Sequence, residues 1–152
     1  ATVCGYSSRM RLDLSVNMLT MQALTNGKIT VFGGQQTRPN IYIDDMISVY
    51  LHFLELGEKA EGIFNAGFEN ISILEIANQV KKHVSAEIEI TESNDPRSYR
   101  QNSDKLFGTG FTPNYSISDG INDVIDAYGV GKIRDVANCY NMKIMKEIIG
   151  YG

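Results

Sequence analysis

The chain has 152 residues, 43% of them hydrophobic and 21% charged, which is enough for one globular domain with a buried core. Its formal net charge of -4 argues against nucleic acid as a partner, because the phosphate backbone would repel it. The sequence contains no apolar stretch as long as a membrane span and no signal-peptide pattern, so we expect no membrane partner. Cys4 and Cys139 lack the spacing of metal ligands, and we expect them to be the reduced thiols of a cytoplasmic protein.

The first residues, 1–5, form an apolar run typical of a β-strand, with no methionine and no turn before it. Because a chain rarely starts within a strand, we interpret residues 1–152 as a single fragment of a longer protein. A helix is predicted over residues 14–25, with Asp13 as its N-cap and Gly27 at its stop. A short strand at 29–32 follows.

The next stretch, 33–45, carries the most informative pattern. It combines a glycine turn at Gly33 and Gly34, a polar loop with Arg38, a short apolar strand at 41–43, and two aspartates that could cap the next helix. Glycines let the backbone approach a ligand closely, and the planar fork of an arginine fits phosphate oxygens. The simpler interpretation is a turn with one solvated arginine.

Residues 46–56 are apolar almost all round, which predicts a helix buried on several sides, and 62–67 are predicted to form a short buried strand. His52 lies in that helix, where a packed residue is expected more often than a ligand. Ser72 and Glu75 form a capping box at the start of the next helix. A half-exposed strand is then predicted at 86–91, an irregular segment at 94–110, and helices at 117–128 and 141–149.

Several of these segments occur together in one known family. Residues 28–33, the spacing of Gly33, Arg38 and Asp44, and residues 104–113 resemble, in the same order, the C-terminal half of NAD-dependent nucleotide-sugar epimerases and dehydratases of the extended short-chain dehydrogenase/reductase family. The resemblance implies an α/β fold. It would comprise the substrate-binding lobe and the last strands and helices of a Rossmann-type domain whose N-terminal part is missing.

The resemblance also implies which residues form the site. The family's positions for diphosphate, base and sugar correspond here to Thr2, Asn17, Thr30, Phe32, Arg38 and Arg97, which makes a nucleoside-diphosphate sugar the expected partner. Residues 2–5 resemble the strand that ends beside the nicotinamide, with Cys4 where a tyrosine is common. In this family the reaction is a transient hydride removal from a sugar carbon, followed by epimerisation or elimination.

Two catalytic parts of the family are absent from the sequence. There is no glycine-rich dinucleotide turn, and the one tyrosine-x-x-x-lysine match, Tyr128 with Lys132, falls at a glycine-broken helix end, so we regard it as chance. We therefore assign no catalytic residue. The parent enzyme is expected to use NAD or NADP, and this chain alone is expected neither to bind the cofactor tightly nor to turn over substrate.

Two other functions compete with this one. One is a stand-alone binding or interaction module with the same fold, and it is distinguished by whether Asn17, Arg38 and Arg97 converge on one cleft. The other, a small hydrolase, lacks a glycine-x-serine-x-glycine elbow and has only His52 and His83 as candidate bases. The family resemblance also implies that the strands matching residues 1–4 and 63–66 and the helix at 46–56 belong with the nucleotide-binding sheet. Without that sheet they would expose apolar surface and strand edges, so we expect a homo-oligomer.

Overall fold

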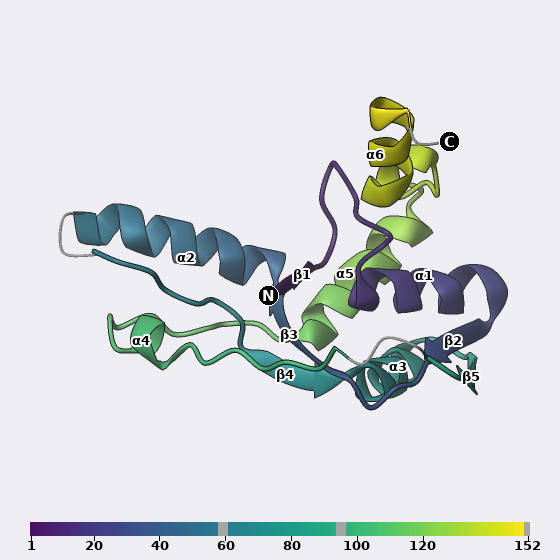
Figure 1. Ribbon diagram of the computed structural model, residues 1–152, viewed down its shortest axis with the longest axis horizontal. Helices are drawn as coiled ribbons and strands as arrows, with labels where there is room; N and C mark the ends of the chain where they lie inside the picture. The colour runs from purple at the N-terminus through teal and green to yellow at the C-terminus, as the bar shows by residue number, and fades with distance from the viewer. Residues whose placement is uncertain (58–60, 94–96, 151–152) are drawn as a thin grey trace.

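The computed structural model describes residues 1–57, 61–93 and 97–150, and it has the mixed α/β architecture expected from the sequence (Figure 1). One sheet has the strand order β1 (Thr2–Cys4), β3 (Thr37–Tyr42), β4 (Glu69–Ser72), with β1 parallel and β4 antiparallel to β3. The other pairs β2 (Lys28–Phe32) with β5 (Glu87–Thr91) in parallel.

Three helices contact one another beside these sheets: α1 (Ser15–Asn26), α3 (Ile73–His83) and α5 (Ile117–Gly129). Their buried faces meet β2 and form the main core, in which apolar side chains recur at helical spacing on each helix. The fully buried members include Val16, Leu19, Ile29, Val31, Ile76, Val80, Ile117 and Ile121. The helices predicted at 14–25 and 117–128, and the strands predicted at 29–32 and 86–91, are therefore confirmed within one or two residues.

Helix α2 (Ile43–Leu56) extends away from these three helices (Figure 1). One side packs through Val49 and Phe53 on the irregular segment 64–68 and on Phe111. The opposite side is open, since Tyr50, Leu51 and Leu54 are 65%, 55% and 77% exposed. The prediction that this helix is buried on several sides is wrong for this chain, because within the described residues only that first side has a neighbour to pack against.

The caps of α1 and α3 agree with the sequence prediction at some helix ends and differ from it at others. The capping box of Ser72 and Glu75 forms at the start of α3, and Gly27 ends α1 in the left-handed conformation (φ 62°). Asp13 does not cap α1: Leu14 is the N-cap residue, and the Asp13 carboxylate instead binds Arg11 at 2.6 Å. An arginine two residues away offers that carboxylate a charged donor, which competes with the helix amides.

The two aspartates after β3 also differ from the prediction. Tyr42 is the N-cap residue of α2, so Asp44 and Asp45 lie in its first turn, where the helix dipole favours negative charge. The predicted strand at 62–67 is absent: these residues are irregular, and Ile63 is 88% exposed. Its carbonyl accepts a hydrogen bond from Lys105 Nζ rather than from a neighbouring strand.

The rest of the chain forms α4 (Asp104–Phe107), the 3-10 helix η2 (Ala137–Cys139) and the predicted last helix, α6 (Asn141–Ile149). The irregular segment predicted at 94–110 is interrupted by α4, and its residues 94–96 lie outside the described part. His52 packs on Phe111 and bonds Thr109 Oγ1 through Nε2 at 2.8 Å, as expected of a packed histidine. No helix in the described ranges is long and apolar enough to cross a membrane.

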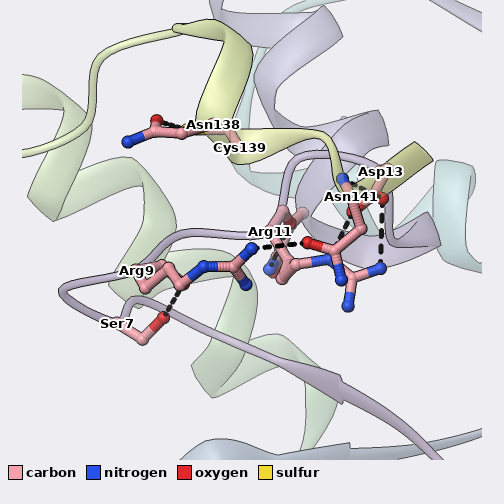
Figure 2. Close-up of polar contacts among 8 residues, drawn as sticks. Ser7, Arg9, Arg11, Asp13, Asn138, Cys139 and Asn141 are labelled. Carbon is pink, nitrogen blue, oxygen red and sulfur yellow. Dashed lines mark hydrogen bonds and ion pairs between the residues drawn. The ribbon is translucent and has the colours of Figure 1, made fainter. Parts of the chain in front are cut away.

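Figure 2 shows how the loop 7–13 holds η2 and α6 against the body of the protein. Arg9 donates to Asn141 Oδ1 at 2.7 Å, and the Asp13 carboxylate accepts from the Asn141 backbone amide at 3.0 Å. Apolar side chains from the loop, α1, α5, η2 and the segment between α5 and η2 form a second small core of Met10, Leu12, Met21, Val124, Ala127, Ile133 and Cys139.

Candidate functional site: a cleft between two arginines

A cleft of about 440 Å³ brings together residues from several segments that are far apart in the sequence. Thr2 of β1, Thr30 and Phe32 of β2, and Arg38 of β3 line it together with Arg97, so the structure gathers five of the six residues predicted to bind substrate. Ligand pockets in proteins usually have at least 300 Å³, so this cleft has room for a nucleotide-sized molecule.

The sheets explain why these residues meet. Thr2 is in register with Asn40, two residues beyond Arg38, so β1 and β3 bring their side chains to one wall. Strand β2 supplies the other wall, with the Phe32 ring 55% exposed. The amide hydrogen of Thr30 is already used, since it is donated to Gln22 Oε1 at 2.9 Å.

Arg38 lies in strand β3 and not in the polar loop that the sequence predicted. Its guanidinium donates to the carbonyl oxygens of Thr37 and Arg97 and sits 5.0 Å from the centre of the Tyr99 ring. A second pair of hydrogen bonds fixes the same segment, because Thr37 N donates to Ser98 Oγ at 3.0 Å and Tyr99 N donates to Thr37 O at 3.2 Å. The two arginine-bearing segments therefore hold each other in place.

Asn17 and Cys4 lie in a neighbouring cavity of about 330 Å³, which shares Thr2 and Leu14 with the cleft. Asn17 is 2% exposed, and its side chain links two backbones: Oδ1 accepts from Gly5 N at 3.0 Å, and Nδ2 donates to Arg11 O at 3.1 Å. The structure thus does not bring Asn17 to the same cleft as Arg38 and Arg97. Instead, Asn17 fixes the turn that follows β1.

The thiol of Cys4 is suited to packing rather than chemistry. It is 1% exposed, and burial raises its pKa to about 12, with the negative charge of Glu69 as the next cause. The nucleophilic form of cysteine is the thiolate, so this side chain is inert near neutral pH.

The sequence patterns did not identify two residues that hold the turn after β1, Tyr42 and Asp123. Asp123 Oδ2 accepts from Tyr6 N at 2.7 Å and from the Tyr42 hydroxyl at 3.2 Å, and burial, followed by the charge of Asp123, raises the pKa of Tyr42 well above its usual range. Gly5 has φ 106°, and a Cβ there would lie 2.6 Å from the Tyr42 ring, so only glycine fits. The sequence signal that could have identified Asp123 is the presence of a carboxylate within the apolar stripe of α5.

The described residues offer little for a metal or a dinucleotide. No group of three or more histidine, cysteine, aspartate or glutamate side chains is arranged to hold a metal ion in the ranges that the structure covers. Strand β3 passes into α2 and β4 into α3 without an intervening glycine. A dinucleotide diphosphate needs a glycine-rich turn between strand and helix, so these junctions do not fit NAD.

No family model matches the sequence. Among solved structures, the chain is similar to the UDP-glucuronic acid 4-epimerase of Bacillus cereus, a structure that holds UDP-glucuronic acid and NAD. The identity is 31% and the TM-score 0.69, over 85% of this chain and 43% of that one.

More distant similarities show the fold alone. An NAD-dependent NDP-hexosamine 5,6-dehydratase of tunicamycin biosynthesis is 20% identical with a TM-score of 0.70, over 88% of this chain and 44% of that one. The ADP-L-glycero-D-manno-heptose-6-epimerase of Helicobacter pylori is 21% identical with a TM-score of 0.66, over 76% and 38%. The chain spans less than half the length of each of these structures.

Proposed function

We propose that this chain, which has the fold of part of the NAD-dependent nucleotide-sugar epimerases and dehydratases, forms the nucleotide-sugar-binding part of such an enzyme. The observation that carries the proposal is the presence of Arg38 and Arg97 on one cleft with Thr30 and Phe32. The ligand class is a nucleoside-diphosphate sugar, and the Bacillus cereus enzyme that the chain resembles was crystallised with one.

Each side chain has a separate task in this proposal. Two phosphates carry more oxygens than one guanidinium can reach, so Arg38 and Arg97 would share the diphosphate. Tyr99 and the carbonyl of Arg97 hold the Arg38 guanidinium in place, which lowers the entropy cost of binding. The exposed ring of Phe32 offers an apolar face for the base.

Cofactor binding is assigned to a part of the protein other than these residues. NAD supplies hydride acceptance in enzymes of this kind, but the two direct strand–helix junctions, β3–α2 and β4–α3, lack the glycine-rich turn that its diphosphate needs. The contribution of this chain is to bind and orient the substrate. We therefore expect no turnover by the chain alone. A cytoplasmic location is part of the proposal and is supported by the two free, buried cysteines.

A second candidate function is an interaction module, and the open face of α2 favours it. Tyr50, Leu51 and Leu54 would place a row of large apolar side chains against a partner. The same face also supports self-association in the leading proposal, since either a second copy or a larger sheet would cover it.

Isothermal titration of the chain with UDP tests the leading proposal. Arg38→Ala and Arg97→Ala should each weaken binding at least about tenfold, because each removes a charge-assisted hydrogen bond to phosphate. Arg100→Ala is the matched control, since Arg100 lies on the same segment but lines a different cavity. UDP binding that is unchanged in both cleft variants would refute the proposed site, and no saturable binding by the wild-type chain would favour the interaction module.

A further inference from the structure

A separate cavity of about 360 Å³ lies between the loop 7–13 and the segment that follows α5. Ser7 and Arg9 line it on the loop side, and Asn138 and Cys139 line it on the other side. Figure 2 shows these four residues on the loop and on η2. The polar side chains that line it are Ser7, Ser8, Arg9, Lys132, Arg134 and Asn138. None of them lines the cleft of Arg38 and Arg97, so a ligand here would be independent of the proposed substrate.

The charge of this cavity is opposite to that of the chain as a whole. Its lining includes three cations and no carboxylate, although the formal net charge of the chain is -4. The carboxylates nearest to these cations in the sequence, Asp13 and Asp135, have other hydrogen-bond partners. Asp13 binds Arg11 and the amide of Asn141, and Asp135 accepts a hydrogen bond from Tyr140. None of the three cations forms an ion pair with a carboxylate among the described residues.

The cations also keep donors available. One nitrogen of the Arg9 guanidinium donates to Asn141 Oδ1, and its other N–H groups make no hydrogen bond to a residue that the structure describes. The Lys132 ammonium lies 5.9 Å from the centre of the Tyr6 ring, and the Arg134 guanidinium makes no hydrogen bond or ion pair with the described residues. Planar forks from two arginines beside a lysine are the donor set that phosphate oxygens favour.

The floor of the cavity is packed into the second core. Met10, Ile133 and Cys139 are only 5–6% exposed and belong to the second core. Leu12 N donates to Cys139 O at 2.9 Å, which ties the loop to η2. A site formed in advance loses less entropy when a ligand binds.

We propose that this cavity is a second anion site, which binds a phosphate-bearing molecule through Arg9, Lys132 and Arg134. The hydroxyl of Ser8 and the amide of Asn138 are within the same lining and add neutral donors. The cavity volume is at the small end of ligand pockets, which suits a phosphate or diphosphate group rather than a whole nucleotide sugar.

The test is a two-dimensional NMR titration of the isotope-labelled chain with inorganic diphosphate. Saturable shifts are expected at the amides of Ser8, Arg9 and Asn138. The double variant Lys132→Gln/Arg134→Gln should weaken these shifts at least about tenfold, as expected for the loss of two charged donors. The matched control is Lys81→Gln/Lys82→Gln, which removes the same charge from an exposed end of α3.

Each other outcome overturns the inference. Shifts confined to Thr30, Phe32 and Arg38 would mean that diphosphate binds only in the substrate cleft. Equal weakening in both double variants would mean non-specific attraction, and no saturable shift at millimolar diphosphate would mean that the cavity binds no phosphate. Because the cleft and this cavity give separate signals, a failure here leaves the proposed function untouched.

Discussion

Asp45 provides the sharpest test of how α2 is held to the rest of the chain. Its side chain is fully buried in the first turn of α2, and its two oxygens accept hydrogen bonds from Asn114 N at 2.9 Å and Tyr115 N at 3.2 Å. The carboxylate thus joins α2 to the segment before α5. Asp44, the preceding residue, is exposed and makes neither contact.

The cost of Asp45→Ala follows from these two bonds. A hydrogen bond to a charged group contributes roughly 1.5 kcal/mol at the lower end of its range, and the lower end applies because Asn114 and Tyr115 are exposed and their freed amides can bind water. We expect a loss of about 3 kcal/mol in the free energy of unfolding. Asp44→Ala should cost about 0.5 kcal/mol, the contribution of one carboxylate near a helix N-terminus.

Urea denaturation followed by circular dichroism measures both values in the same buffer. Asp45→Asn should fall between the two, since it keeps one acceptor oxygen and directs an N–H at the second donor. Thermal unfolding should agree, with a decrease in Tm of about 6 to 12 °C for Asp45→Ala at this chain length. The reasoning is refuted if Asp45→Ala is no less stable than Asp44→Ala.

Two further predictions concern the pH dependence of stability and the exposed apolar face of α2. Burial raises the pKa of the Glu69 carboxyl, so the folded state holds its proton more tightly than the unfolded state. The free energy of unfolding should therefore fall as pH rises from 4.5, the ordinary pKa of the group, to the raised pKa of the folded state. Glu69→Gln keeps an oxygen for Ile117 N and should flatten this fall in urea denaturation at acid and neutral pH; an unchanged profile would contradict it. Leu54→Glu should reduce self-association in sedimentation velocity and change the free energy of unfolding by less than about 0.5 kcal/mol, whereas Asn78→Glu on exposed α3 surface should leave association as it is.

Sequence was most informative where a signal is local. The capping box of Ser72 and Glu75 and the apolar stripes of α1, α3 and α5 depend on neighbours within one or two turns, and the structure has these helices. Signals that depend on distant partners were misread. An all-round apolar helix looks the same whether its partner lies in this chain or outside it. The pattern alone therefore predicted a buried α2, and only the family resemblance led us to expect exposed apolar surface on it.

Pro39 shows why the extent of β3 was underestimated. A proline normally argues against a central strand, because it donates no ladder hydrogen bond. Here β1 pairs with β3 only from Asn40 onward, so Pro39 has β4 as its one neighbour and occupies a local edge. The register that permits this depends on residues 30 positions away, and no local pattern encodes it.

The candidate site was predictable only in part. The resemblance identified five residues that line the cleft. Arg38, however, lies in a strand and not in the predicted loop. Asn17 does not line the cleft, because its side chain binds the backbone of Gly5 and Arg11. Tyr99 was missed because its role depends on the fold bringing its ring beside Arg38. Composition gave no hint of the cationic cavity, since its charges come from segments more than a hundred residues apart and the total is negative.

The direct passage of β3 into α2 and of β4 into α3 limits how the chain can change in length. With no connecting residue to absorb it, one inserted residue at either junction would turn the following helix by about 100°. At the first junction, that rotation would carry Asp45 away from Asn114 and redirect the whole apolar side of α2. Insertions should therefore be rejected at residues 42–43 and 72–73, where each strand runs directly into its helix.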